Sequence, residues 1–66
     1  MKRYYFELLD EQYNNLGACI PDGSHKATAV NRAKAWMREN NVPEVLLEVN
    51  SMKTGNLLEM ILITIK

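Results

Sequence analysis

Apolar and polar residues alternate over two short stretches near the start of the chain. In residues 4–9 the apolar side chains of Tyr4, Phe6 and Leu8 share one side, which is typical of a strand with one buried face. Residues 16–20 alternate in the same way. We expect them to form a second, shorter strand that pairs with the first as a hairpin.

The apolar period then changes from two to 3.6, which indicates a helix over residues 25–40. Residues 21–24 give a dense turn signal, and Ser24 is placed to cap the helix. Asn40 and Asn41 suit a left-handed helix end, and Pro43 prevents continuation. The apolar stripe that we expect to pack on the sheet, with its tryptophan largely buried, comprises Ala29, Val30, Ala33, Trp36 and Met37.

Two further alternating stretches follow the helix. Residues 44–50 predict a third strand, and residues 57–66 predict a fourth in which both sides are apolar. A strand that is apolar on both sides is normally covered on both faces. We therefore place the fourth strand inside the sheet, next to the first, with the second and third strands at the edges. An all-antiparallel order with the fourth strand at an edge is the alternative.

The predicted order of elements is β-β-α-β-β. No repeat, linker or low-complexity run divides the 66 residues, so we expect a single domain over residues 1–66. Two hairpins joined by one helix give an α+β fold of two layers, with the helix packed on a four-stranded, mostly antiparallel sheet. A chain of this length buries only about 60% of the surface that its unfolded form exposes, so its core is thin.

One helix can cover only one face of such a sheet, and the same alternation places apolar side chains on the other face. Small proteins always expose some apolar atoms, but contiguous apolar patches beyond a few hundred Å² are uncommon on soluble monomers. We therefore expect a two-fold homodimer, formed through the sheet face or a sheet edge. Cys19 should share the open face with the predicted self-association surface, which comprises Tyr5, Leu46, Leu58, Met60 and Leu62.

Composition narrows the range of functions and locations. Eight Lys and Arg balance eight Asp and Glu, and a neutral chain is not typical of a nucleic-acid binder. A single Cys excludes an internal disulfide and favours a reducing compartment. The most apolar stretch, residues 57–65, is too short to span a bilayer, and we find no signal-peptide pattern. We expect a cytoplasmic protein without membrane contact.

Few residues could carry chemistry. Cys19, Asp22 and His25 flank one turn near the helix start and would be the candidates for a nucleophilic site, but no further orienting group stands at a recognisable spacing. They do not repeat the ligand pairs of a zinc site, and the scattered glycines form no phosphate loop. We predict no enzyme activity, metal or cofactor. Glu59 lies among apolar residues and is either an end-of-strand charge in water, which we favour, or paired with a cation.

A charge asymmetry distinguishes the helix from the rest of this neutral chain. Half of the chain's cations lie on it: Lys26, Arg32, Lys34 and Arg38. Asn31, Lys34 and Arg38 follow the spacing i, i+3, i+7 and form one polar ridge that could meet phosphates or an acidic partner. A solvated helix face is the simpler interpretation, and we favour it because nucleic-acid-binding domains are usually basic overall.

The order of elements over residues 4–37 resembles the small domain of HicB-type antitoxins: a strand, an acidic turn, a strand, Pro21-Asp22-Gly23, and an Ala-rich helix with Asn31. The resemblance spans about half of the chain and transfers no functional residue. It implies a cytoplasmic binding domain that dimerises and contacts a partner protein. We therefore expect a small non-catalytic interaction or regulatory domain that self-associates through apolar sheet surface. The alternative is a nucleic-acid-associated protein that uses the helix ridge.

Overall fold

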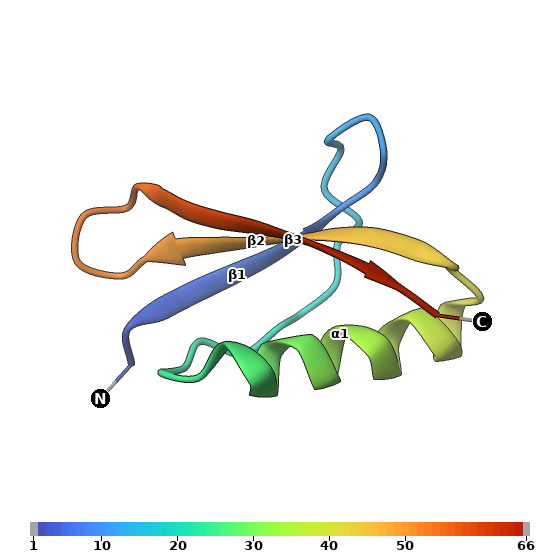
Figure 1. Cartoon of the computed structure of the whole chain (residues 1–66), viewed down its shortest axis with the longest axis horizontal. Coiled ribbons are helices and arrows are strands. Elements are labelled where there is room, and N and C mark those ends of the chain that lie inside the picture. Colours follow the sequence, from blue (N-terminus) through green and yellow to red (C-terminus); the bar gives the residue numbers. More distant parts are fainter. Residues whose placement is uncertain (1, 66) are drawn as a thin grey trace.

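The chain folds into a three-stranded antiparallel sheet and one helix, in a computed structural model that describes residues 2–65. Its elements follow the order β1 (Tyr4–Leu9), α1 (Lys26–Asn40), β2 (Glu44–Ser51) and β3 (Leu57–Thr64). Figure 1 shows α1 on one side of the sheet and the loop after β1 rising on the other. The α+β class expected from the sequence is confirmed.

β2 is the central strand of the sheet. β1 and β3 both pair with it in antiparallel registers that place Leu47 opposite Leu8 on one side and Ile61 on the other. The prediction that strand 57–66 lies inside the sheet beside the first strand, with strand 44–50 at an edge, is wrong. The structure has the alternative, an all-antiparallel order with the last strand at an edge. Among the described residues β3 pairs only with β2, at an edge, and it ends at Thr64. The alternating pattern of β2 is sufficient for a central position, because α1 covers only one face of the sheet.

Residues 16–20 do not form the predicted second strand, which leaves three strands instead of four. They belong to a segment that bridges β1 only at its two ends: Leu9 with Asn15, and Tyr4 with Gly23. The segment takes eight residue steps between these bridges and β1 takes five, so a continuous ladder cannot form. Gly17, with a φ of +75°, bends the backbone and so accommodates part of the extra length of this segment. Its N–H donates to Asn15 Oδ1 at 2.7 Å.

α1 begins one residue later than expected and ends as expected. His25 occupies the N-cap and no side chain caps the helix, so the predicted cap by Ser24 is wrong. At the other end Asn41 adopts φ 56° and ψ 41°, the left-handed conformation expected of a helix end. The Val42 N–H then donates to Met37 O at 2.9 Å.

The core lies between α1 and the helix-facing side of the sheet. Met37 is fully buried there, whereas Trp36 packs against the core and is only partly buried, less than the sequence led us to expect. Trp36 lies about 100° around the helix from Met37 and reaches the sheet from the flank. The buried cluster comprises Phe6, Leu8, Ile20, Ala29, Ala33, Met37, Val45, Leu47, Val49 and Ile63.

Candidate self-association surface

The open face of the sheet, opposite α1, carries an apolar strip along β3. Met60 and Leu62 lie on this face, opposite Glu48 and Leu46, with exposed fractions of 37% and 58%, and Leu58 exposes 55% at the register shift beside Val49 and Asn50. Leu46 on β2 stands directly opposite Leu62 and is half-buried. We call these four residues the β3 strip. A hollow of about 460 Å³ at the Leu62 end of the strip is bordered by three acidic residues: Asp10, Glu11 and Glu44.

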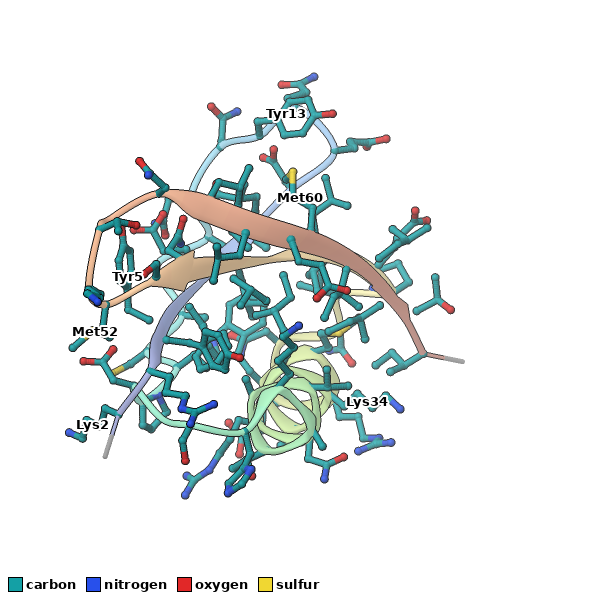
Figure 2. The ribbon with its side chains drawn as sticks, turned by 60° about the vertical axis from the view of Figure 1, so that its left-hand side comes forward. Lys2, Tyr5, Tyr13, Lys34, Met52 and Met60 are labelled. Carbon is teal, nitrogen blue, oxygen red and sulfur yellow. The ribbon has the colours of Figure 1, made fainter. Side chains whose placement is uncertain are left out.

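Tyr5, the fifth residue predicted for this surface, stands apart from the β3 strip. It lies on β1 opposite Asn50, and its hydroxyl donates to Gly55 O in the turn between β2 and β3 at 3.2 Å. Figure 2 shows Tyr5 and Met60 over different parts of the sheet. Cys19 is exposed in the segment that does not join the sheet. The structure therefore unites four of the five predicted residues.

Two carboxylates occupy the middle of the open face, and the sequence reasoning did not include them in the surface. Glu7 on β1 and Glu48 on β2 stand directly opposite each other and are half-buried. Met60 is the neighbour of Glu48 on its other side, and Asn50 Nδ2 donates to Glu48 Oε1 at 3.0 Å. Strand alternation alone places both carboxylates on this face. Its centre is therefore acidic, and the apolar character is confined to the β3 side.

The β3 strip borders an edge that carries no further strand in residues 2–65. The Ile65 N–H donates to Pro43 O at 2.9 Å, so by antiparallel alternation the odd-numbered residues of β3 bond to β2. Residues 60, 62 and 64 accordingly direct their N–H and C=O groups away from β2. Edge strands of soluble proteins are commonly protected by Lys, Pro or inward-pointing charges. β3 has only one charge, Glu59.

Glu59 forms an ion pair with Lys26, the first residue of α1, at an Nζ–Oε1 distance of 2.7 Å. From the sequence we favoured an unpaired charge at the end of the strand. The structure instead shows the alternative, in which Glu59 is paired with a cation. The hydrogen bond and charge of Glu59 raise the pKa of Lys26 above its ordinary value. Both side chains are more than 40% exposed, so solvent screens the pair. The contact shows that the start of α1 lies level with Glu59.

The three residues of the predicted polar ridge all lie on α1. Asn31 and Arg38 are exposed, and Lys34 is half-buried. Figure 2 shows Lys34 on the flank of α1 that lies away from β1 and Lys2. The ridge therefore begins beside the β3 edge and continues onto the outer surface of the helix.

The residues around the turn before α1 do not gather into a reactive centre. Asp22 and His25 line a hollow of about 330 Å³ together with Arg32, but Cys19 is not part of its lining. Within residues 2–65 no three or more His, Cys, Asp and Glu side chains are grouped so that they could hold a metal ion. No helix in that range has the length and apolar character needed to cross a membrane.

Comparison with known proteins gives no relative from which a function could be carried over. The chain matches no protein-family model, no curated protein and no solved structure. The resemblance to HicB-type antitoxins therefore stays a prediction. Function has to be inferred from the surface described above.

Proposed function

We propose that this chain is a small non-catalytic interaction domain that associates with a second copy of itself through the apolar surface of β3. One observation supports the proposal most strongly. Four large apolar side chains on a single strand expose between 37% and 58% of their surface: Leu57, Leu58, Met60 and Leu62. Scattered apolar side chains need no explanation, but exposed Leu and Met side chains concentrated on one edge strand are typical of an association surface.

Burial of these side chains gives an approximate strength for the association. A fully buried Leu or Met side chain contributes about 1.5–3 kcal/mol relative to an exposed one, and these four are already about half-buried. Eight such side chains from two copies would contribute about 8 kcal/mol. Loss of translational and rotational freedom costs a similar amount, about 4–15 kcal/mol, so apolar burial alone does not reach the roughly −8 kcal/mol of a micromolar Kd. Hydrogen bonds between the outward N–H and C=O groups of two β3 strands, at about 0.5–1.5 kcal/mol each, would supply the remainder. We expect a reversible dimer whose Kd lies in the micromolar range.

Sedimentation velocity over a micromolar concentration series tests the proposal. The wild-type mass should rise from one chain to two as the concentration rises. The double variant Leu58→Glu, Leu62→Glu should stay monomeric and folded by circular dichroism, because both side chains are already exposed in the monomer. Met52→Glu is the matched control, because Met52 is equally exposed in the turn outside the β3 strip. A wild-type chain that stays monomeric at every concentration rejects the proposal.

The helix ridge supports a second candidate function, association with nucleic acid. Asn31, Lys34 and Arg38 present two positive charges and an amide on one helix face, a combination that can contact phosphates. The formal net charge of zero counts against this candidate. DNA affinity that falls steeply with salt and is reduced in the double variant Lys34→Gln, Arg38→Gln would favour it over self-association.

A further inference from the structure

Two copies could associate through β3 either by packing their open faces together or by pairing their β3 edges. The positions of Glu7 and Glu48 favour the second arrangement. Packing two open faces together would bring both carboxylates of each copy into one layer about 10 Å thick. No cation lies between these opposed carboxylates in the register of β1 and β2, so their burial would be strongly unfavourable. Pairing at the β3 edge leaves the open face in water and avoids this cost.

We propose that two copies join edge to edge through β3, antiparallel and across a two-fold axis, with Ile61 facing the partner's Ile61. This proposal rests on the proposed function and specifies that the β3 edge forms the contact between the two copies. Two three-stranded sheets then become one continuous sheet of six strands. The outward N–H and C=O groups of β3 gain partners, and Met60 lies beside the partner's Leu62, so apolar side chains meet apolar side chains.

The ion pair at the start of α1 shows where Lys34 lies along β3, and this position favours the register. Lys26 contacts Glu59, and Lys34, eight residues later, lies about 12 Å further along the helix axis at 1.5 Å per residue. A strand covers that distance in three to four residues at about 3.3 Å each. Lys34 is therefore level with Ile63. When Ile61 faces the partner's Ile61, antiparallel pairing puts the partner's Glu59 opposite Ile63.

Charge complementarity follows from the direction of α1. The helix runs parallel to β3, from Glu59 at its start to Ile65, whose N–H donates to Pro43 O just beyond the helix. Lys34 lies on the flank away from β1 (Figure 2), beside the free edge. The Lys34 ammonium of each copy therefore meets the carboxylate of the partner's Glu59, and the two-fold axis repeats the contact. A register centred on residue 59 would instead oppose two Glu59 carboxylates, which is unfavourable.

Disulfide trapping tests the register. In a Cys19→Ser background, Ile61→Cys places two thiols at the two-fold axis with Cα atoms about 4.5 Å apart, as in a non-hydrogen-bonded pair. That distance lies within the range that a disulfide spans, about 4.4–6.8 Å. Met60→Cys and Leu62→Cys are the controls, because in this register each is offset by two residues from its symmetry mate, about 7–8 Å away. Mild oxidation should therefore give a covalent dimer with Ile61→Cys alone.

The remaining outcomes separate this proposal from the proposed function. Efficient cross-linking of Met60→Cys or Leu62→Cys alone would overturn the register. A chain that dimerises in sedimentation but cross-links at none of the three positions would overturn edge pairing in this register while leaving self-association intact. A chain that sediments as a monomer throughout would reject the proposed function itself.

Three charge variants give a readout that does not depend on thiols. Lys34→Glu should weaken the dimer about tenfold, because it replaces two attractive contacts by two repulsive ones. Arg38→Glu, one turn further along the exposed ridge, should leave the Kd unchanged. Met60→Lys should weaken the dimer less than Lys34→Glu does, because residue 60 contacts the partner's Leu62 along one side only and the open face remains in water. Dissociation by Met60→Lys with no effect of Lys34→Glu would indicate face-to-face packing and overturn the proposal.

Discussion

Met37 and Met52 allow a matched test of where the core lies. Met37 is fully buried under the sheet, whereas Met52 exposes 45% of its surface in the turn between β2 and β3. Replacing a buried Met by Ala removes apolar contacts and leaves a cavity, at a cost of about 2–5 kcal/mol. An exposed substitution changes stability by about 0.5 kcal/mol or less. A domain of 66 residues is stable by about 3–10 kcal/mol in total, so Met37→Ala should remove much of that stability.

Urea unfolding followed by the fluorescence of Trp36, the single tryptophan, measures both free energies of unfolding. Met37→Ala should lower the midpoint strongly and Met52→Ala should hardly change it. If Met37→Ala is unfolded without urea, Met37→Leu should remain folded at a cost below about 1.5 kcal/mol, because it nearly conserves volume. Equal effects of the two alanine substitutions would refute the assignment of the buried side of α1.

Three further predictions concern the sheet, the loop after β1 and the end of α1. At concentrations where the chain is monomeric, amide exchange should be slowest in β2, which is paired on both sides; slower exchange in β3 would contradict the strand order. The Asn14 and Gln12 N–H groups donate to Asp10 Oδ1 at 2.9 and 2.8 Å and hold the pKa of Asp10 below its usual 3.8. The stabilisation is present above the unfolded pKa and is lost as pH falls through the folded pKa, so Asp10→Asn should flatten the acid side of the stability profile, and an NMR titration midpoint at or above 3.8 would count against it. Asn41→Val should lower the free energy of unfolding by about 1–2 kcal/mol because φ is 56° there, whereas Asn41→Gly should not lower it; equal melting temperatures for the two variants would contradict the left-handed cap.

Local patterning predicted four elements that the structure contains and one strand that it does not, and it did not predict the order of the strands. β1 has the expected bounds, and α1, β2 and β3 differ from expectation by one or two residues at one end each, because alternation and helical periodicity are properties of neighbouring residues. The two apolar sides of residues 57–66 indicate cover on both faces, and we assigned that cover to the interior of the sheet. One chain's pattern cannot distinguish an interior strand from an edge strand that a second copy covers.

For the candidate surface too, the sequence predicts local features but not which residues of different strands become neighbours. Alternation assigns each residue to a face, but only the register reveals that Leu46 stands opposite Leu62 and that Glu7 stands opposite Glu48. The missing strand at residues 16–20 has a local cause, because positive φ angles at Tyr13 and Gly17 interrupt extended backbone. The glycine was a visible signal of this interruption, and the tyrosine was not.

Sedimentation velocity of the wild-type chain beside Leu62→Pro tests the free edge of β3 most directly. The N–H of residue 62 points away from β2, so proline there removes a donor at the edge and spares the ladder between β2 and β3. We predict that the wild-type chain dimerises as its concentration rises through the micromolar range. Leu62→Pro should remain a monomer with the circular dichroism of the folded chain. A folded Leu62→Pro chain that dimerises as tightly as the wild type would contradict association through this edge.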